Sequence, residues 1–150
     1  MRKMQRWILL LFGVVGALLI AAVCLAVWFK QFASKVEPPM TALNIYTDTL
    51  IQRDYQSAYI ITSPAFRAAT PYSELVDYQS KLTKELGNLK SAKQTYWQVH
   101  EENGIAMADI QADLQFEHGL KTFQFVLRKE DGIWRVLSSQ SPDGAILGQH

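Results

Sequence analysis

The longest uncharged stretch of the chain, the 23 residues from Trp7 to Phe29, constrains the fold more than any other feature. In a helix that rises ~1.5 Å per residue it would extend ~34 Å, slightly more than the ~30 Å hydrocarbon layer of a bilayer. A helix also satisfies its own backbone hydrogen bonds, as a segment in lipid must. Trp7 and Trp28 stand near its ends, where amphipathic rings favour the headgroup level. The sequence therefore predicts one transmembrane helix, residues 7–29, in contact with membrane lipid.

The charges on either side of this segment predict its orientation. Residues 1–35 carry five basic side chains and no acid, whereas residues 36–150 carry ten bases and fourteen acids, a net charge of −4. Three of the basic residues and the amino terminus precede the apolar run, and Lys30 and Lys35 follow it. This bias favours a cytoplasmic segment 1–6 and an extracytoplasmic C-terminal domain. The acidic domain has no basic stripe of the kind that nucleic acid requires, which excludes DNA and RNA as partners.

Two alternatives compete with a permanent anchor. A cleaved signal peptide has an apolar core of ~7–15 residues, and this run is longer. A lipidated cysteine normally follows a small residue, whereas Val23 precedes Cys24. Within the run, Gly13, Ala17 and Ala21 recur at the four-residue spacing that lets two membrane helices approach closely, although small residues are common in such helices anyway. These three residues are the candidate contact between membrane helices.

Residues 30–39 form a short linker that ends in Pro38-Pro39, and residues 40–141 form one small domain. Apolar spacing predicts a helix from Met40 to about Arg53, and Asp54 is a candidate cap for a second, short helix. Ser63-Pro64 predicts one helical turn, and Thr70-Pro71 predicts the start of a third, longer helix that ends at Gly87.

From Leu89 the apolar period changes to two, which predicts strands. Asn103-Gly104, His118-Gly119 and Asp131-Gly132 mark three two-residue turns, so that the strands form a four-stranded antiparallel meander. When the strands are aligned on these turns, one face of the sheet carries Trp97, Val99, Ile110, Phe125, Leu127 and Trp134, together with Thr95 and Ser138. The three helices must cover this apolar face. We expect the tail, residues 142–150, to be flexible.

An α+β fold of three helices and a four-stranded meander resembles the nuclear transport factor 2-like, or cystatin-like, cone. The resemblance covers roughly residues 40–140, and structural motifs carry it. These are the stretches Arg53–Tyr59, Ser63–Arg67, Leu86-Gly87 and Lys129–Val136. The sequence pattern is similar to that of small bacterial members of this superfamily that are exported or held at the membrane. The superfamily includes enzymes, binding modules and assembly domains, so the resemblance implies a fold rather than an activity.

Catalytic relatives of the cone react substrates between the sheet and the helices, where an acid or base must point inward. The predicted inward face holds no carboxylate and no histidine, which argues against catalysis unless a helix supplies the group. Small residues beneath the helices leave room either for core side chains or for a small apolar ligand. The residues that would line such a pocket are Tyr46, Tyr59, Tyr78, Trp97, Phe125 and Trp134, with Tyr55 as a further candidate.

The opposite face mixes charged and apolar side chains. In the predicted register Asp109 lies between Gln98 and Arg128, with Arg135 beyond, which is either a solvated charge row or part of an interface. Exposed apolar residues beside arginines favour an interface. The candidate interface residues are Tyr96, Met107, Asp109, Val126, Arg128, Arg135 and Leu137, and we expect them to contact a protein partner or a second copy.

These observations lead to one favoured interpretation. The chain is a single-pass protein of a bacterial inner or plasma membrane, and its extracytoplasmic domain is a non-enzymatic interaction or assembly module. A binder of a small apolar ligand is the second hypothesis, and an isomerase- or dehydratase-like enzyme is the third. His100, His118 and His150 lack a metal-ligand spacing, so we expect no metal, and no motif indicates a cofactor or a catalytic residue.

Overall fold

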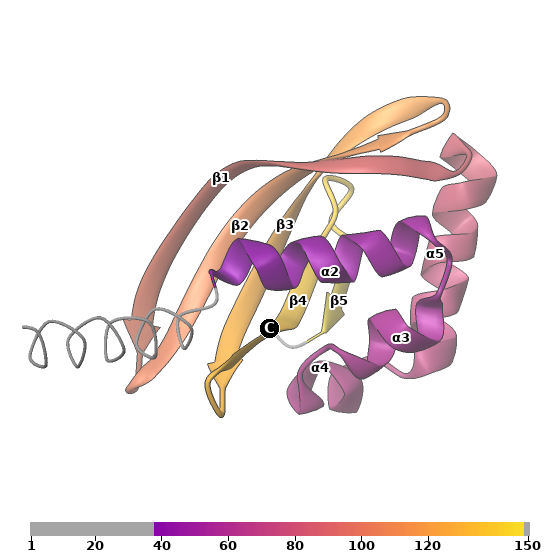
Figure 1. Cartoon of the computed structure of the whole chain (residues 1–150). Coiled ribbons are helices and arrows are strands. Elements are labelled where there is room, and N and C mark those ends of the chain that lie inside the picture. Colours follow the sequence, from indigo (N-terminus) through magenta and orange to yellow (C-terminus); the bar gives the residue numbers. More distant parts are fainter. Residues whose placement is uncertain (1–37, 149–150) are drawn as a thin grey trace, which may run out of the picture. The chain divides into compact units, whose positions relative to one another are not determined.

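The structure is a computed structural model that describes residues 38–148. Several predictions fall outside the described residues. They are the transmembrane helix, the segment 1–6, most of the linker, and the candidate helix contact at Gly13, Ala17 and Ala21. Within residues 38–148, no helix is long and apolar enough to cross a membrane. The described part of the chain is an α+β domain of four helices and one five-stranded antiparallel sheet (Figure 1).

The helices begin where the sequence places capping residues. Helix α2 spans Pro39–Ile51, α3 spans Tyr55–Ile60, α4 spans Pro64–Ala69 and α5 spans Tyr72–Leu86. The Asp54 carboxylate accepts a hydrogen bond from the Ser57 N–H, and the Ser63 hydroxyl accepts one from the Phe66 N–H. Both caps are confirmed. The segment after Ser63 is a full six-residue helix rather than a single turn, because Phe66 is completely buried and anchors it.

Helix α5 departs from the prediction at its start. Thr70 does not cap it, and the residue before its first turn is Pro71, which has no side chain to accept a hydrogen bond. The Thr70 hydroxyl instead accepts a hydrogen bond from the backbone N–H of Gly148, 2.8 Å away. The helix ends at Gly87, whose φ of +79° confirms the predicted positive-φ residue at this position.

The sheet contains one strand more than the sequence predicts. Strands β1 (Leu89–Glu102), β2 (Ile105–Phe116), β3 (Gly119–Glu130) and β4 (Ile133–Gln140) form the predicted meander, and β5 (Ile146–Gly148) pairs with β4. The expectation of a flexible tail from Pro142 is therefore wrong for this segment. Leu147 is buried and Gly148 is bonded to Thr70, so tertiary contacts hold a strand that is too short to be recognised by periodicity.

The first and third turns agree with the sequence, and the second is displaced. Asn103, Gly104, Asp131 and Gly132 all have φ between +51° and +82°, as two-residue turns of this type require. Between β2 and β3, however, Phe116 pairs with Gly119, so that the turn is Glu117-His118. The predicted register of β2 against β3 is wrong by two residues. An even shift leaves each residue on its predicted face.

Two bulges change faces that the regular register had predicted. In β1, Gln94 pairs with Ala112 and Tyr96 with Gln111, so Thr95 is the extra residue and Gln94 takes its place on the inner face. In β4, Val126 pairs with Ser138 while Leu127 pairs with Val136, so the irregularity falls at Leu137. Ser138 is consequently in register with Val126 and does not occupy the predicted inward position.

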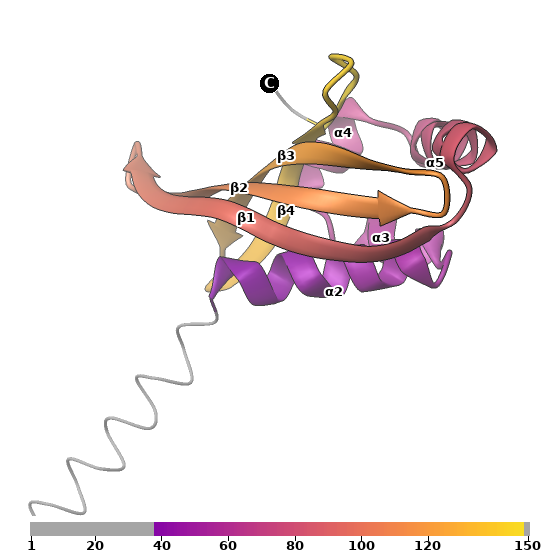
Figure 2. The same cartoon turned by 90° about the horizontal axis from the view of Figure 1, so that it is seen from above.

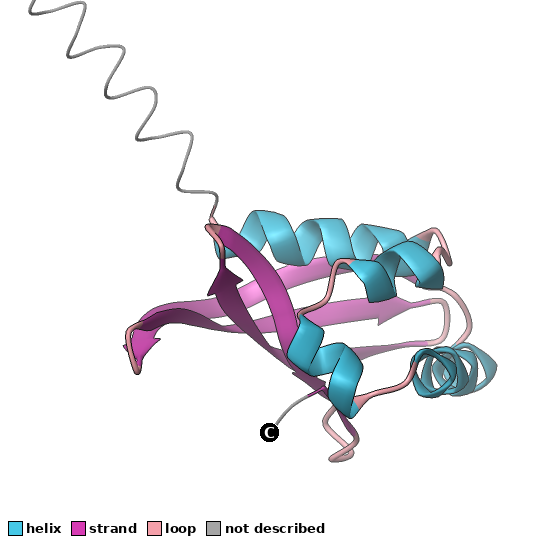
Figure 3. Cartoon of the chain, turned by 90° about the horizontal axis from the view of Figure 1, so that it is seen from below, coloured by secondary structure: helices cyan, strands magenta, loops and turns pink. Residues whose placement is uncertain are grey.

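Helix α2 lies over one face of the curved sheet, which we call the inner face, and α5 stands at the end of the sheet near the β2–β3 turn (Figures 2 and 3). Helix α2 crosses this face in contact with β1 and β4, and α4 contacts β4 and β5. The core between the two layers contains Leu43, Tyr46, Phe66, Leu75, Ile110, Phe125, Leu127, Trp134 and Val136. The prediction that helices cover the apolar face is confirmed. The opposite, outer face carries no helix among the described residues.

Candidate functional site

The predicted inner pocket is mostly filled by core side chains. Tyr46, Phe125 and Trp134 are only 1%, 2% and 6% exposed, and the rings of Tyr46 and Phe125 meet edge to face with centroids 6.2 Å apart. Trp97 shares the inner face with Ile110, its partner on β2, but is half-exposed. Phe125 and Trp134 therefore lie in the core as interior packing demands, and Trp97 lies apart from them.

The tyrosines of the helical layer have structural partners. The Tyr59 hydroxyl donates to the backbone oxygens of Arg67 and Thr70, 3.2 and 3.0 Å away, and so fastens α3 to the C-terminal end of α4. Burial raises the pKa of Tyr46 and, to a smaller extent, the pKa of Tyr78, which keeps both phenols neutral. The Tyr78 hydroxyl is buried near Ser141 and makes no hydrogen bond of normal geometry within the described residues.

A shallow groove remains beside this core, between α2 and β4. It has a volume of about 250 Å³, and Tyr46 and Trp134 form part of its wall. Ile45 and Ile133 also line it and are each about half-exposed. Of the predicted pocket residues, Tyr46 and Trp134 line this groove. The groove is mainly apolar, and its one charged lining residue is Arg135.

A hollow larger than this groove lies on the side of the sheet that the sequence analysis identified as an interface. It measures about 470 Å³ and receives side chains from all five strands. We call it the outer groove. Its lining residues are His100, Glu102, Met107, Asp109, Gln124, Val126, Leu137, Ser138, Gln140 and Ile146. Gln124 and Gln140 also line a second hollow of about 740 Å³, which continues the surface to Leu120 and the β4–β5 turn.

Apolar side chains and one ion pair give the outer groove a mixed surface. Met107, 8% exposed, lies lowest, and the partly buried Val126 and Leu137 flank it. At the β1 side, His100 Nδ1 lies 3.3 Å from Asp109 Oδ2, so the two groups form an ion pair whenever the imidazole is protonated. At the other end of the surface, Lys121 Nζ lies 3.6 Å from Asp143 Oδ2. Polar groups therefore border an apolar centre.

The structure brings four of the seven predicted interface residues into the outer groove: Met107, Asp109, Val126 and Leu137. Tyr96 lies beside it, in a smaller hollow that it shares with Asp109 and Val126. Arg128 and Arg135 pair with each other on neighbouring strands outside the groove. The predicted contact of Asp109 with Arg128 is wrong, because the displaced β2–β3 turn places Val126 opposite Asp109 and Met107 opposite Arg128.

The sequence analysis missed several residues of the groove, each for a definable reason. The sequence analysis considered His100 only as a metal ligand. Across the Asn103-Gly104 turn, His100 pairs with Met107, which lies two residues before Asp109 on β2 and on the same face. Ser138 reaches the groove because of the irregularity at Leu137, and Ile146 belongs to the unpredicted strand β5. The apolar pair Ile146-Leu147 in the tail was the signal that a further strand existed.

Among residues 38–148, no Asp, Glu or His is buried, and the buried polar residues are serines and threonines. Within the same range, no group of three or more His, Cys, Asp or Glu side chains is arranged to hold a metal ion. Lys129 Nζ lies over the Trp134 ring, 5.8 Å from its centroid.

The similarity to the nuclear transport factor 2-like superfamily stays a prediction. Comparison of the sequence with protein-family models and with curated proteins finds no match.

Proposed function

We propose that the chain is a membrane-anchored interaction module whose extracytoplasmic domain binds a protein partner through the outer groove. The single observation that carries this proposal is the form of the outer face. Among residues 38–148, the five-stranded sheet has one side without helices, and that side is hollowed over an apolar centre formed by Met107, Val126 and Leu137. Single exposed apolar residues are ordinary, but a concave apolar patch with a polar border is typical of an interface.

The packing of the inner face supports a role in binding rather than in catalysis. The cone's usual reaction chamber would lie where Tyr46, Phe125 and Trp134 are buried in one hydrophobic core. A general acid or base must reach its substrate within hydrogen-bond distance, and side chains in a close-packed core leave no volume for one. The proposal therefore assigns the function to the outer face and assigns the inner face to stability.

Photo-crosslinking in native membranes tests the outer groove directly. Gln124 is exposed and lines the groove, whereas Gln56 is equally exposed on α3, away from it. With p-benzoylphenylalanine at position 124 we expect ultraviolet-dependent crosslinks to one protein species, and at position 56 we expect none to that species. Leu137→Arg in the same chain should remove the crosslink, because a charge would occupy the apolar centre.

Two results would contradict the proposal. Equal crosslinking from positions 124 and 56 would show random encounters in the membrane, and the absence of any crosslink from position 124 would remove the partner. Ile60→Arg is the matched control for Leu137→Arg, since Ile60 is 56% exposed on α3. This control variant should leave the crosslink at position 124 unchanged.

A second candidate function is the binding of a small apolar ligand in the groove between α2 and β4. The half-exposed Ile45 and Ile133, together with the edge of Trp134, favour it. A ligand there would quench or shift tryptophan fluorescence and raise the melting temperature of the purified chain. A panel of fatty acids and apolar metabolites that changes neither quantity, in the wild type and in Ile133→Asp alike, would remove this alternative.

A further inference from the structure

The last part of β1 is an unusual edge of the sheet. Strand β1 has β2 as its one strand neighbour among the described residues, and from Thr95 to Glu102 every residue is exposed. Tyr96, Trp97 and Val99 are 50%, 49% and 47% exposed. In Figures 1 and 2 this part of β1 extends past the first turn of α2 to the Asn103-Gly104 turn. The helical layer thus leaves both faces of the strand uncovered here.

Proteins normally protect such an edge with charged residues, proline or β-bulges, because its unpaired backbone groups can bind another strand. Between Gln94 and His100 the sequence QTYWQVH contains no lysine, arginine, proline or carboxylate, and the bulge at Thr95 is its one protecting feature. The charges stand only at the two ends of this uncharged run. Lys93 lies before it, and Glu101 and Glu102 lie after it. A strand with a base at one end and acids at the other is complementary to itself when the second copy runs antiparallel.

We propose that two copies of this chain pair antiparallel through the Lys93–Glu102 segment of β1, about a twofold axis at Gln98. The pairing would join the two sheets into one. It is a contact of the sheet edge that shares His100 and Glu102 with the border of the outer groove, and it is an isologous interface of the kind most homodimers use. The partner strand supplies hydrogen bonds to backbone groups that β2 leaves free, as in other cases of strand addition.

The faces of the side chains select this register. Trp97 and Val99 both lie on the inner face, because they pair with the buried Ile110 and Ala108. With the axis at Gln98, Trp97 of one copy stands opposite Val99 of the other, which is an aromatic–β-branched pair of the stabilising kind. A shift of one residue would place the inner-face Trp97 opposite the outer-face Gln98, and so mix the two faces.

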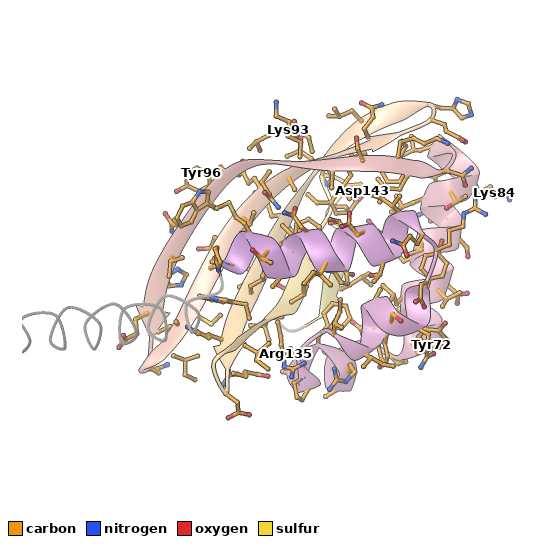
Figure 4. The ribbon with its side chains drawn as sticks, viewed as in Figure 1. Tyr72, Lys84, Lys93, Tyr96, Arg135 and Asp143 are labelled. Atoms are coloured by element: carbon orange, nitrogen blue, oxygen red, sulfur yellow. The ribbon has the colours of Figure 1, made fainter. Side chains whose placement is uncertain are left out.

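The bulge at Thr95 then brings opposite charges together. Lys93 pairs with Asp113 and Tyr96 with Gln111 on the outer face, and Figure 4 shows Lys93 and Tyr96 projecting from β1 on the side away from α2. With Thr95 as the extra residue of the new ladder too, Glu101 of one copy stands opposite Gln94 of the other. Glu102 stands opposite Lys93, on the same outer face, and the symmetry makes this ion pair twice. The register centred on Gln98 is the one that both keeps the faces together and places Lys93 opposite an acid.

The symmetry also suits a chain that is anchored by its N-terminus. A twofold axis between antiparallel strands of one sheet is perpendicular to that sheet, so both copies keep their helices on the same side. Pro38, which precedes α2, is therefore on the same side of the joined sheet in both copies, as two copies in one membrane require. Gln94, whose side chain reaches Met40 O at 3.4 Å and Asn44 Oδ1 at 2.5 Å, holds the start of α2 to this strand.

Cysteine crosslinking of the full chain in its native membrane tests the pairing. Cys24 is first replaced by serine, because it is the one natural cysteine. In Gln98→Cys the two cysteines face each other across the axis, at a Cα separation of about 4.5–5.5 Å. In Ser91→Cys, seven residues away on the same exposed strand, the two cysteines would lie about 48 Å apart. We expect mild oxidation or a short bis-maleimide to give at least tenfold more dimer from Gln98→Cys than from Ser91→Cys.

A charge exchange in the Gln98→Cys background provides the second measurement. Lys93→Glu should lower the crosslinked fraction several-fold, because two acids would then stand opposite each other, and Lys93→Glu with Glu102→Lys should restore it. Equal crosslinking from positions 98 and 91 would overturn the proposal, since the membrane segment alone would then hold the copies together. A monomer from both positions, a crosslink from position 98 to a different protein, or a double variant that is not restored would overturn it as well. Circular dichroism equal to that of the wild type shows that these exposed variants are folded.

Discussion

Gly148 provides the sharpest test of the unexpected fifth strand. Its φ is +96°, in the region that favours glycine, and its backbone N–H donates a buried hydrogen bond to Thr70 Oγ1. A Cβ built at this position would lie 2.6 Å from Phe66 Cδ2 and 2.8 Å from Ser138 Cα, and would also collide with the Leu137 oxygen. Two of these three atoms belong to the backbone of β4. The chain around Gly148→Ala cannot relax by moving a flexible side chain, so β5 must leave the sheet.

The cost follows from what β5 contributes. Exposing Leu147, now 4% exposed, costs about 2 kcal/mol, and losing the buried hydrogen bond to Thr70 costs about 1 kcal/mol. We therefore expect Gly148→Ala to lower the free energy of unfolding by about 3 kcal/mol. Gly144→Ala is the matched control. Its φ is +85° and nothing lies within 4 Å of the added Cβ, so it should cost only the conformational strain of about 1 kcal/mol.

Urea unfolding of a fragment that starts at Glu37, followed by the fluorescence of Trp97 and Trp134, measures both variants. This fragment is a compact unit with its own core. The order of the two variants is the decisive result. Equal destabilisation by Gly148→Ala and Gly144→Ala, or a Gly148→Ala variant as stable as the wild type, would show that β5 does not pack against β4 in solution.

Three further predictions concern the core, an exposed ion pair and the helical layer. Phe125→Ala should lower the free energy of unfolding in urea by about 3–5 kcal/mol, because Phe125 is buried in the core. Trp97→Ala should lower it by less than about 1 kcal/mol, because Trp97 is half-exposed. The reverse order would contradict the placing of Phe125 inside the core and of Trp97 outside it. Hydrogen bonds from Lys90 and Asn88 lower the pKa of Glu117 to about 2, so its stabilising effect is present above its ordinary value of 4.5 and is lost as the pH falls toward 2. The difference in urea midpoint between the wild type and Glu117→Gln should therefore be visible at pH 6 and mostly lost by pH 2, and a difference independent of pH would refute this reasoning. Tyr59→Phe removes the hydroxyl that donates to Arg67 O and Thr70 O and should cost about 1–2 kcal/mol, which thermal unfolding would detect as a lower Tm; an unchanged Tm would contradict the role of that hydroxyl.

Features of the fold that depend on neighbouring residues could be predicted from the sequence. The Asn103-Gly104 and Asp131-Gly132 turns form because both residues of each pair tolerate positive φ. Asp54 and Ser63 cap the helices that follow them because each needs only a backbone N–H three residues away. The alternation of apolar and polar residues identified the buried face of β2, β3 and β4, since every second residue of a strand points to the same side. The candidate interface was found by the same rule.

Features that depend on distant residues were decided by the tertiary structure. The β2–β3 turn is Glu117-His118 because the Glu117 carboxylate binds Asn88 and Lys90, and the His118 N–H donates to Leu86 O, all near the end of α5. Those contacts outweigh the local preference of glycine for the turn. The register of the outer groove, and with it the partner of Asp109, follows from that choice.

The same reason explains the tail and the bulges. Three residues of β5 carry too little local signal to specify a strand, and a hydrogen bond to Thr70, 78 positions earlier, holds them in place. The irregularities at Thr95 and Leu137 turn Gln94 toward α2 and place Ser138 in the outer groove. Local sequence therefore determined the helices, the first four strands and which faces were apolar. The pairing of distant segments, whose energies no short window of sequence contains, determined where the groove lies and which residues line it.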